Sequence, residues 1–98
     1  MSKNLEISKV LTVSTSHITE EVAKQLDRES ETNEYALSVY NKDDYGWWIC
    51  IPEDYKSVCG HIPSCLRKLI ELATTNDCNW LCIDCDGPEV DGLETYSW

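Results

Sequence analysis

The sequence predicts an α+β domain of the ferredoxin-like type, with two helices on one face of a four-stranded, mostly antiparallel sheet. The prediction rests on the order of hydrophobic periodicities, which reads strand, helix, strand, strand, helix, strand along 98 residues. A chain of this length forms a single domain, 1–98, and its 42% hydrophobic residues suffice for a core.

The first strand and the first helix are predicted in the N-terminal third of the chain. Leu5 to Ser14 is rich in apolar and β-branched residues, which favours a strand. Thr19 is of a type preferred at a helix N-cap, and Glu20 and Glu21 would lie at the positive end of the helix dipole. A charged run, Asp27 to Glu34, precedes the next predicted strand.

A hairpin, a second helix and a last strand follow. Tyr35–Tyr40 and Tyr45–Ile51 are the predicted hairpin strands, and Pro63 is expected in the first turn of the helix, where its missing N–H costs little. The apolar stripe of that helix has helical spacing: Leu66, Leu69, Ile70 and Ala73. We expect Asn76 as a left-handed cap and Trp80–Asp86 as the last strand.

Side chains alternate along a strand, so the sheet has two predicted faces. One is expected to meet the helices: Leu37, Val39, Trp47, Ile49, Ile51, Leu81, Ile83 and Cys85. The other is expected to stay uncovered: Ser38, Tyr40, Trp48, Cys50, Trp80, Cys82, Asp84 and Asp86. The uncovered face is therefore aromatic with an acidic margin.

The charge balance excludes some partners. Eight Lys and Arg residues against eighteen Asp and Glu residues give a formal net charge of −10. Nucleic acids and anionic lipids bind through clustered cations, so we expect no direct contact with nucleic acid and none with a membrane. The sequence shows neither an export signal nor a membrane-spanning run, so we expect a cytoplasmic protein with reduced cysteines.

Several short patterns resemble chemical sites without completing them. The cysteines of Cys78–Cys85 have the C-x3-C-x2-C spacing of an iron–sulfur cluster motif. Cys59–Cys65 contains Cys and His residues of the kind that bind zinc, but their spacing does not match a zinc-binding motif. Asp84–Gly87 reads D-x-D-G, as in haloacid dehalogenase phosphatases, but leaves no room for their downstream motifs. His17 is expected to be a hydrogen-bonding loop residue. We expect no catalytic residue, metal or cofactor, and a small metal-dependent enzyme is the third alternative.

Negative charge accumulates toward the C-terminus, where no Lys or Arg follows Lys68. If extended, Asp84 and Asp86 would lie about 6.6 Å apart, on the order of successive phosphates along a nucleic-acid strand. Such charges also serve solubility, but large aromatic residues beside them favour an interface. The predicted partner-binding residues are Asp84, Asp86, Glu89, Asp91, Glu94, Tyr40, Trp48 and Trp80.

Four segments, Val13–Glu21, Tyr45–Ile49, Asp77–Gly87 and Leu93–Trp98, resemble the bacterial domain of unknown function family 5983. The resemblance implies a small protein of prophages, plasmids and similar mobile elements, with no assigned activity. Small acidic inhibitors of restriction enzymes and CRISPR effectors occur on such elements, and several mimic nucleic acid.

The expected function is therefore that of a non-enzymatic inhibitor, such as an anti-CRISPR or antirestriction protein. It would dock on the basic surface of a nucleic-acid-handling protein. The alternative is a structural or assembly module that forms a homodimer through its aromatic sheet face.

Overall fold

The computed structural model describes residues 5, 7–53, 55 and 59–98. The elements in chain order are β1 (Val10–Ser14), the 3₁₀ turn η1 (Thr15–His17), α1 (Glu20–Thr32), β2 (Ser38–Lys42), β3 (Gly46–Cys50), the 3₁₀ turn η2 (Cys59–His61), α3 (Ser64–Thr75) and β4 (Trp80–Asp84). This confirms the α+β class and the predicted order of strands and main helices. No described helix has the length and apolar character needed to cross a membrane.

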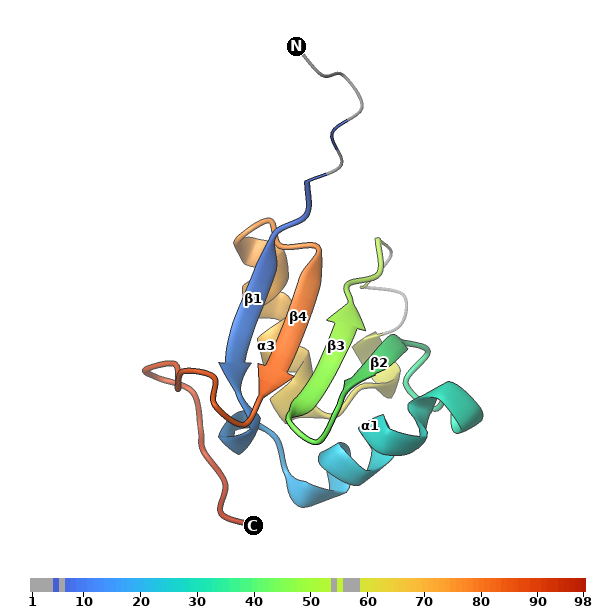
Figure 1. Ribbon diagram of the computed structural model, residues 1–98, viewed down its shortest axis with the longest axis vertical. Coiled ribbons are helices and arrows are strands. Elements are labelled where there is room, and N and C mark those ends of the chain that lie inside the picture. Colours follow the sequence, from blue (N-terminus) through green and yellow to red (C-terminus); the bar gives the residue numbers. More distant parts are fainter. Residues whose placement is uncertain (1–4, 6, 54, 56–58) are drawn as a thin grey trace.

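The four strands form one mixed sheet in the order β1-β4-β3-β2 (Figure 1). β4 pairs antiparallel with β3 and parallel with β1, and β2 pairs antiparallel with β3. A ferredoxin-like sheet has its first strand between the third and fourth strands, so the predicted strand order is wrong at β1 and β4. β4 takes the inner position and β1 the edge because β4 is the more buried strand. Four of the five β4 residues are buried, whereas in β1 only the last two are.

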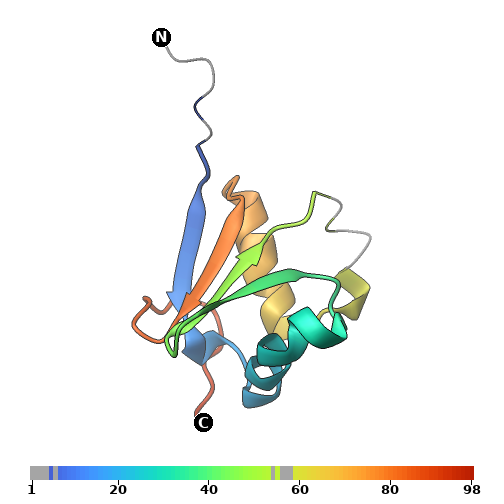
Figure 2. The same ribbon diagram turned by 45° about the vertical axis from the view of Figure 1, so that its right-hand side comes forward.

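Both helices lie on the same side of the sheet (Figure 2). Val22 and Leu26 of α1 and Leu69 of α3 are buried in one core cluster with Ile49 and Ile83 of the sheet. Among the described residues, no helix lies on the opposite side of the sheet, as the sequence predicts.

The helix α1 includes most of the charged run Asp27–Glu34. Thr19 caps its start by accepting a 3.3 Å bond from the Val22 N–H, and Asn33, with φ of 53°, ends it. Glu29 is only 1% exposed because its carboxylate accepts the backbone N–H groups of Tyr35 and Leu37. Most charged residues of this run thus lie on the exposed face of the helix, whereas the Glu29 carboxylate lies on its buried face.

Strand boundaries differ from the predictions for local reasons. β1 begins at Val10 because its partner strand begins at the paired residue Trp80. β2 begins at Ser38 because the preceding N–H groups of Tyr35 and Leu37 bind Glu29.

The two ends of α3 also differ slightly from the predictions. Pro63 is the N-cap residue and lies just outside the first turn. The left-handed residue after the helix is Asp77, with φ of 58°, and Asn76 at φ of −97° is not left-handed.

The strand register confirms the predicted division of the sheet faces, with one exception. Trp48 lies opposite Tyr40 on one side and Cys82 on the other, on the uncovered face. The expected core residues are buried or packed against the core: Leu37, Val39, Trp47, Ile49, Ile51, Leu81 and Ile83. Cys85 is exposed instead, because β4 ends at Asp84 and the chain turns.

Candidate protein-interaction surface

Acidic residues from four segments gather at one end of the sheet. The register sets the end of β2, the start of β3, the end of β4 and the end of β1 in one row: Lys42, Gly46, Asp84 and Ser14. The β2–β3 turn, the turn after β4 and the start of α1 therefore lie at this end (Figure 1). We call it the acidic end: Glu20, Asp27, Asp43, Asp44, Asp84, Asp86, Glu89, Asp91 and Glu94.

The C-terminal segment, residues 88–98, is held at this end by the connection between β1 and α1. The Pro88 carbonyl accepts the Ser14 N–H at 2.9 Å, and the Ser16 carbonyl accepts the Tyr96 N–H at 2.7 Å. The Ser16 hydroxyl donates to the Glu89 carboxylate at 2.9 Å. These bonds fix part of the acidic segment instead of leaving it to move freely.

His17 lies at the centre of this contact and is 2% exposed. Its Nε2 accepts the Val90 N–H at 2.8 Å, and its Nδ1 lies 2.8 Å from the Glu94 carbonyl. Because Nε2 accepts, Nδ1 carries the proton and donates to that carbonyl. The prediction of a hydrogen-bonding loop histidine is confirmed, although nothing in the sequence indicated its partners.

Asp84 differs from the other predicted acidic residues because a cation already neutralises it. Its carboxylate pairs with the Lys42 ammonium, and its side chain is only 12% exposed. The bond from Lys42, followed by the bond from the Asp86 N–H, holds the pKa of Asp84 below its usual range. The same bond raises the pKa of Lys42. Asp84 therefore contributes little free charge.

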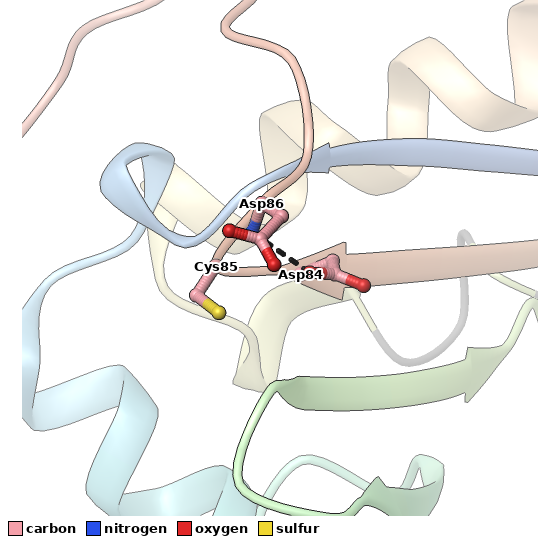
Figure 3. Close-up of side chains that lie close together, drawn as sticks. All are labelled: Asp84, Cys85 and Asp86. Atoms are coloured by element: carbon pink, nitrogen blue, oxygen red, sulfur yellow. Dashed lines mark hydrogen bonds between the residues drawn. The ribbon is translucent and has the colours of Figure 1, made fainter.

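Asp84, Cys85 and Asp86 lie close together in a tight turn (Figure 3), and their ligand atoms fall within 4.8 Å of one another. The Gly87 N–H donates to the Asp84 carbonyl at 2.9 Å, and the Asp86 N–H donates to Asp84 Oδ1 at 2.8 Å. The expected extended spacing of Asp84 and Asp86 is therefore wrong. Both Asp84 oxygens are already hydrogen-bonded, so a metal ion would compete with the Lys42 ammonium for this carboxylate.

The other cysteine and histidine patterns show no common site among the described residues. Cys65 is buried in the core, whereas His61 is exposed. The side chain of Cys59 lies outside the described part. Cys82 is 1% exposed, and burial raises the pKa of its thiol, which disfavours a nucleophilic role.

Three predicted aromatic residues, Tyr40, Trp48 and Trp80, meet on the uncovered sheet side, which we call the aromatic face. The ring centroids of Tyr40 and Trp80 are 6.0 Å apart, and Tyr40 pairs across the strands with Trp48. With Ser8 and Val10 they line a shallow groove of about 420 Å³. The Lys42 ammonium lies 5.5 Å from the Trp48 ring centroid, beside the groove.

A second cavity, of about 390 Å³, lies at the acidic end between α1 and the β2–β3 turn. The predicted site omitted the acidic residues that line it: Glu20, Asp27, Asp43 and Asp44. Asp43 and Asp44 of the turn could have been predicted from the sequence. β3 pairs antiparallel with β4, so the β2–β3 turn lies at the end of the sheet where β4 ends. The helix residues required the packing of α1, which the sequence does not specify.

Comparison with known protein families identifies one family, whose function is unknown. Residues 10–98 match the family model described as "Family of unknown function (DUF5983) C-terminal domain". Searches of curated proteins and of solved structures found no significant match. The matched region includes all described strands, both main helices and the acidic end. The chain belongs to this family of unknown function.

Proposed function

We propose that the chain is a non-enzymatic protein-binding inhibitor whose acidic end docks on a basic surface of a nucleic-acid-handling protein. An anti-CRISPR or antirestriction protein of a bacterial mobile element, acting in the cytoplasm, is the specific form of this proposal. The observation that carries it is the gathering of carboxylates from four segments at one end of the sheet.

Most of these carboxylates form no ion pair with a described cation. The ion pair of Lys42 with Asp84 is the one such pair in the part of the chain that the structure describes. Asp86, Asp91, Asp43 and Asp44 are exposed. A field of one sign steers an oppositely charged partner and raises its association rate.

The acidic end also has a defined shape. Hydrogen bonds with the backbone of Ser14 and Ser16 and with the His17 ring hold the C-terminal segment, and Lys42 holds the turn at Asp84. Charges that are already in place lose less conformational entropy on binding. In this proposal Asp84 positions the turn, whereas Asp86, Glu89, Asp91 and Glu94 face the partner.

Affinity capture tests this function. The immobilised protein is exposed to a bacterial lysate at low salt, and bound proteins are eluted with increasing salt. We expect nucleic-acid-handling proteins that elute as salt rises, since screening acts over about 8–10 Å at physiological ionic strength. A parallel column carries Asp86→Lys/Asp91→Lys, which should lose these proteins. Partners that are retained at high salt, or bound equally by both columns, would contradict the proposal.

The aromatic face supports a second candidate, a homodimeric assembly module. Tyr40 and Val10 are 56% and 43% exposed beside the apolar groove, and solvated apolar patches of this kind often mark interfaces. Native mass spectrometry decides between the two functions. A dimer that dissociates in Trp48→Ser would support the assembly module, and a monomer at all practical concentrations would contradict it.

A further inference from the structure

We propose that the cavity between α1 and the β2–β3 turn receives an arginine side chain of the basic partner. This inference rests on the proposed function and specifies where the partner is recognised. The cavity measures about 390 Å³ and is separate from the aromatic face, since their lining residues do not overlap. Three things point to arginine: the apolar walls, the charge of the rim and the spacing of the carboxylates.

The walls of the cavity are aromatic. Trp47 of β3 is 8% exposed and donates its indole N–H to Asp27 Oδ1 of α1 at 2.9 Å. Trp98 contributes another wall, and its indole N–H donates to the Ile18 carbonyl at 2.9 Å. Tyr45 also lines the cavity. A planar guanidinium stacks on such rings and gains a cation–π attraction there.

The rim is strongly negative. Its carboxylates come from α1 and the hairpin turn: Glu20, Asp27, Asp43 and Asp44. Lys24 is the one cationic side chain that lines the cavity among the residues the structure describes, and it forms no ion pair with these carboxylates there. A cation entering the cavity therefore meets acceptors that no other described cation holds.

The spacing of the carboxylates favours an organic cation over a metal ion. Three ligand atoms lie within 4.8 Å of one another only in the Asp84, Cys85 and Asp86 group among the described residues. Among the described residues, no three carboxylates of the cavity therefore lie close enough together to surround one small ion. A water molecule occupies about 30 Å³, so a cavity of 390 Å³ has room for a side chain.

Guanidinium fits this arrangement better than an ammonium group. It offers five N–H donors in one plane, so a single group can bind more than one carboxylate while its face stacks on an indole. An ammonium group is more strongly hydrated and binds as a point charge. We therefore expect a preference for arginine over lysine at equal charge.

The test uses two labelled pentapeptides of equal charge, KKRKK and KKKKK, measured by fluorescence anisotropy at low salt. We expect the arginine peptide to bind about 5-fold more tightly to the full chain. Asp43→Asn/Asp44→Asn should abolish this preference, and asparagine tolerates the left-handed φ of 48° at position 43. The matched control Glu31→Gln/Glu34→Gln removes the same charge from exposed positions and should keep the preference.

Indole signals in proton–nitrogen correlation spectra locate the bound peptide. Binding in the cavity should shift the Trp47 and Trp98 signals and leave those of Trp48 and Trp80 unchanged. Shifts confined to Trp48 and Trp80 would overturn the inference and favour the aromatic face. If free arginine binds as tightly as KKRKK, the proposal that the occupant is a side chain of a partner protein would be wrong.

The remaining outcomes separate this inference from the proposed function. If both peptides bind equally, and the two double variants weaken them equally, the cavity is not the site and only the general acidic recognition survives. If neither peptide binds at low salt, both proposals fail.

Discussion

The backbone N–H of Val90 donates a 2.8 Å hydrogen bond to Nε2 of His17, a side chain that is 2% exposed. The bond links the connection after β1 to the C-terminal segment, 73 residues further along the chain. On the other side of the ring, Nδ1 donates to the Glu94 carbonyl. The position of the acidic segment therefore depends in part on one buried imidazole.

Replacing His17 tests this dependence. In His17→Gln we expect the free energy of unfolding to fall by about 1–3 kcal/mol, the cost of leaving buried polar groups without partners. Amide hydrogen exchange at Val90 should accelerate more than exchange in the strands. His61→Gln, at an exposed position, is the control. Equal effects of the two variants in urea unfolding would show that the His17 bonds do not hold the segment.

Glu29 gives a second test, because it is a buried carboxylate inside an otherwise exposed charged run. It accepts N–H groups from Tyr35 and Leu37 and from the Gln25 amide. Glu29→Gln replaces one acceptor oxygen by a donor, so we expect a loss of about 1–3 kcal/mol in urea unfolding. Glu31→Gln should change stability little. A neutral effect of Glu29→Gln would mean that these bonds contribute nothing net.

The Lys42–Asp84 pair predicts a pH dependence of stability. The pKa of Asp84 is lowered in the fold, so its contribution is present above its unfolded value of about 3.9 and is lost as pH falls through the folded value. The pKa of Lys42 is raised, so its contribution is present below about 10.4 and is lost as pH rises through the folded value. The pair therefore stabilises between these limits.

Thermal denaturation followed by circular dichroism measures this effect. Asp84→Asn should lower Tm near neutral pH, and its difference from wild type should shrink below about pH 4. Asp86→Asn keeps the backbone N–H that binds Asp84 and is the control. A difference that stays constant down to strongly acidic pH would contradict a role for the Asp84 charge.

Gly46 is required where β3 leaves the hairpin turn. Its φ is 151°, and a Cβ there would lie 1.7 Å from the Ile83 carbonyl oxygen. Gly46→Ala must therefore push β3 away from β4, and we expect a large loss of Tm. Gly60→Ala, where a Cβ meets nothing within 4 Å, is the control. Equal Tm values for the two variants would contradict the close strand approach.

Local patterns predicted the elements and sheet faces well. Period-two alternation placed Tyr40, Trp48 and Trp80 on one uncovered face, because side-chain direction in a strand depends only on position. The cap at Thr19 was equally local.

Predictions that depend on tertiary partners were less successful. The strand order depends on which strand is buried most. The residue at which β2 begins depends on the Glu29 carboxylate of α1. Asp84 was predicted as a free charge because its partner, Lys42, lies 42 residues away. The cavity required the same long-range information, since it joins α1 to the hairpin turn.

Recognition of a basic partner by the acidic end is tested by the affinity of the partner identified by capture. The affinity is measured against salt for wild type, Asp86→Asn/Asp91→Asn and the control Glu31→Gln/Glu34→Gln. We predict affinity that falls as salt rises, with weaker binding at low salt only for the Asp86 and Asp91 variant. Affinity that is independent of salt, or equal for the two double variants, would contradict the claim.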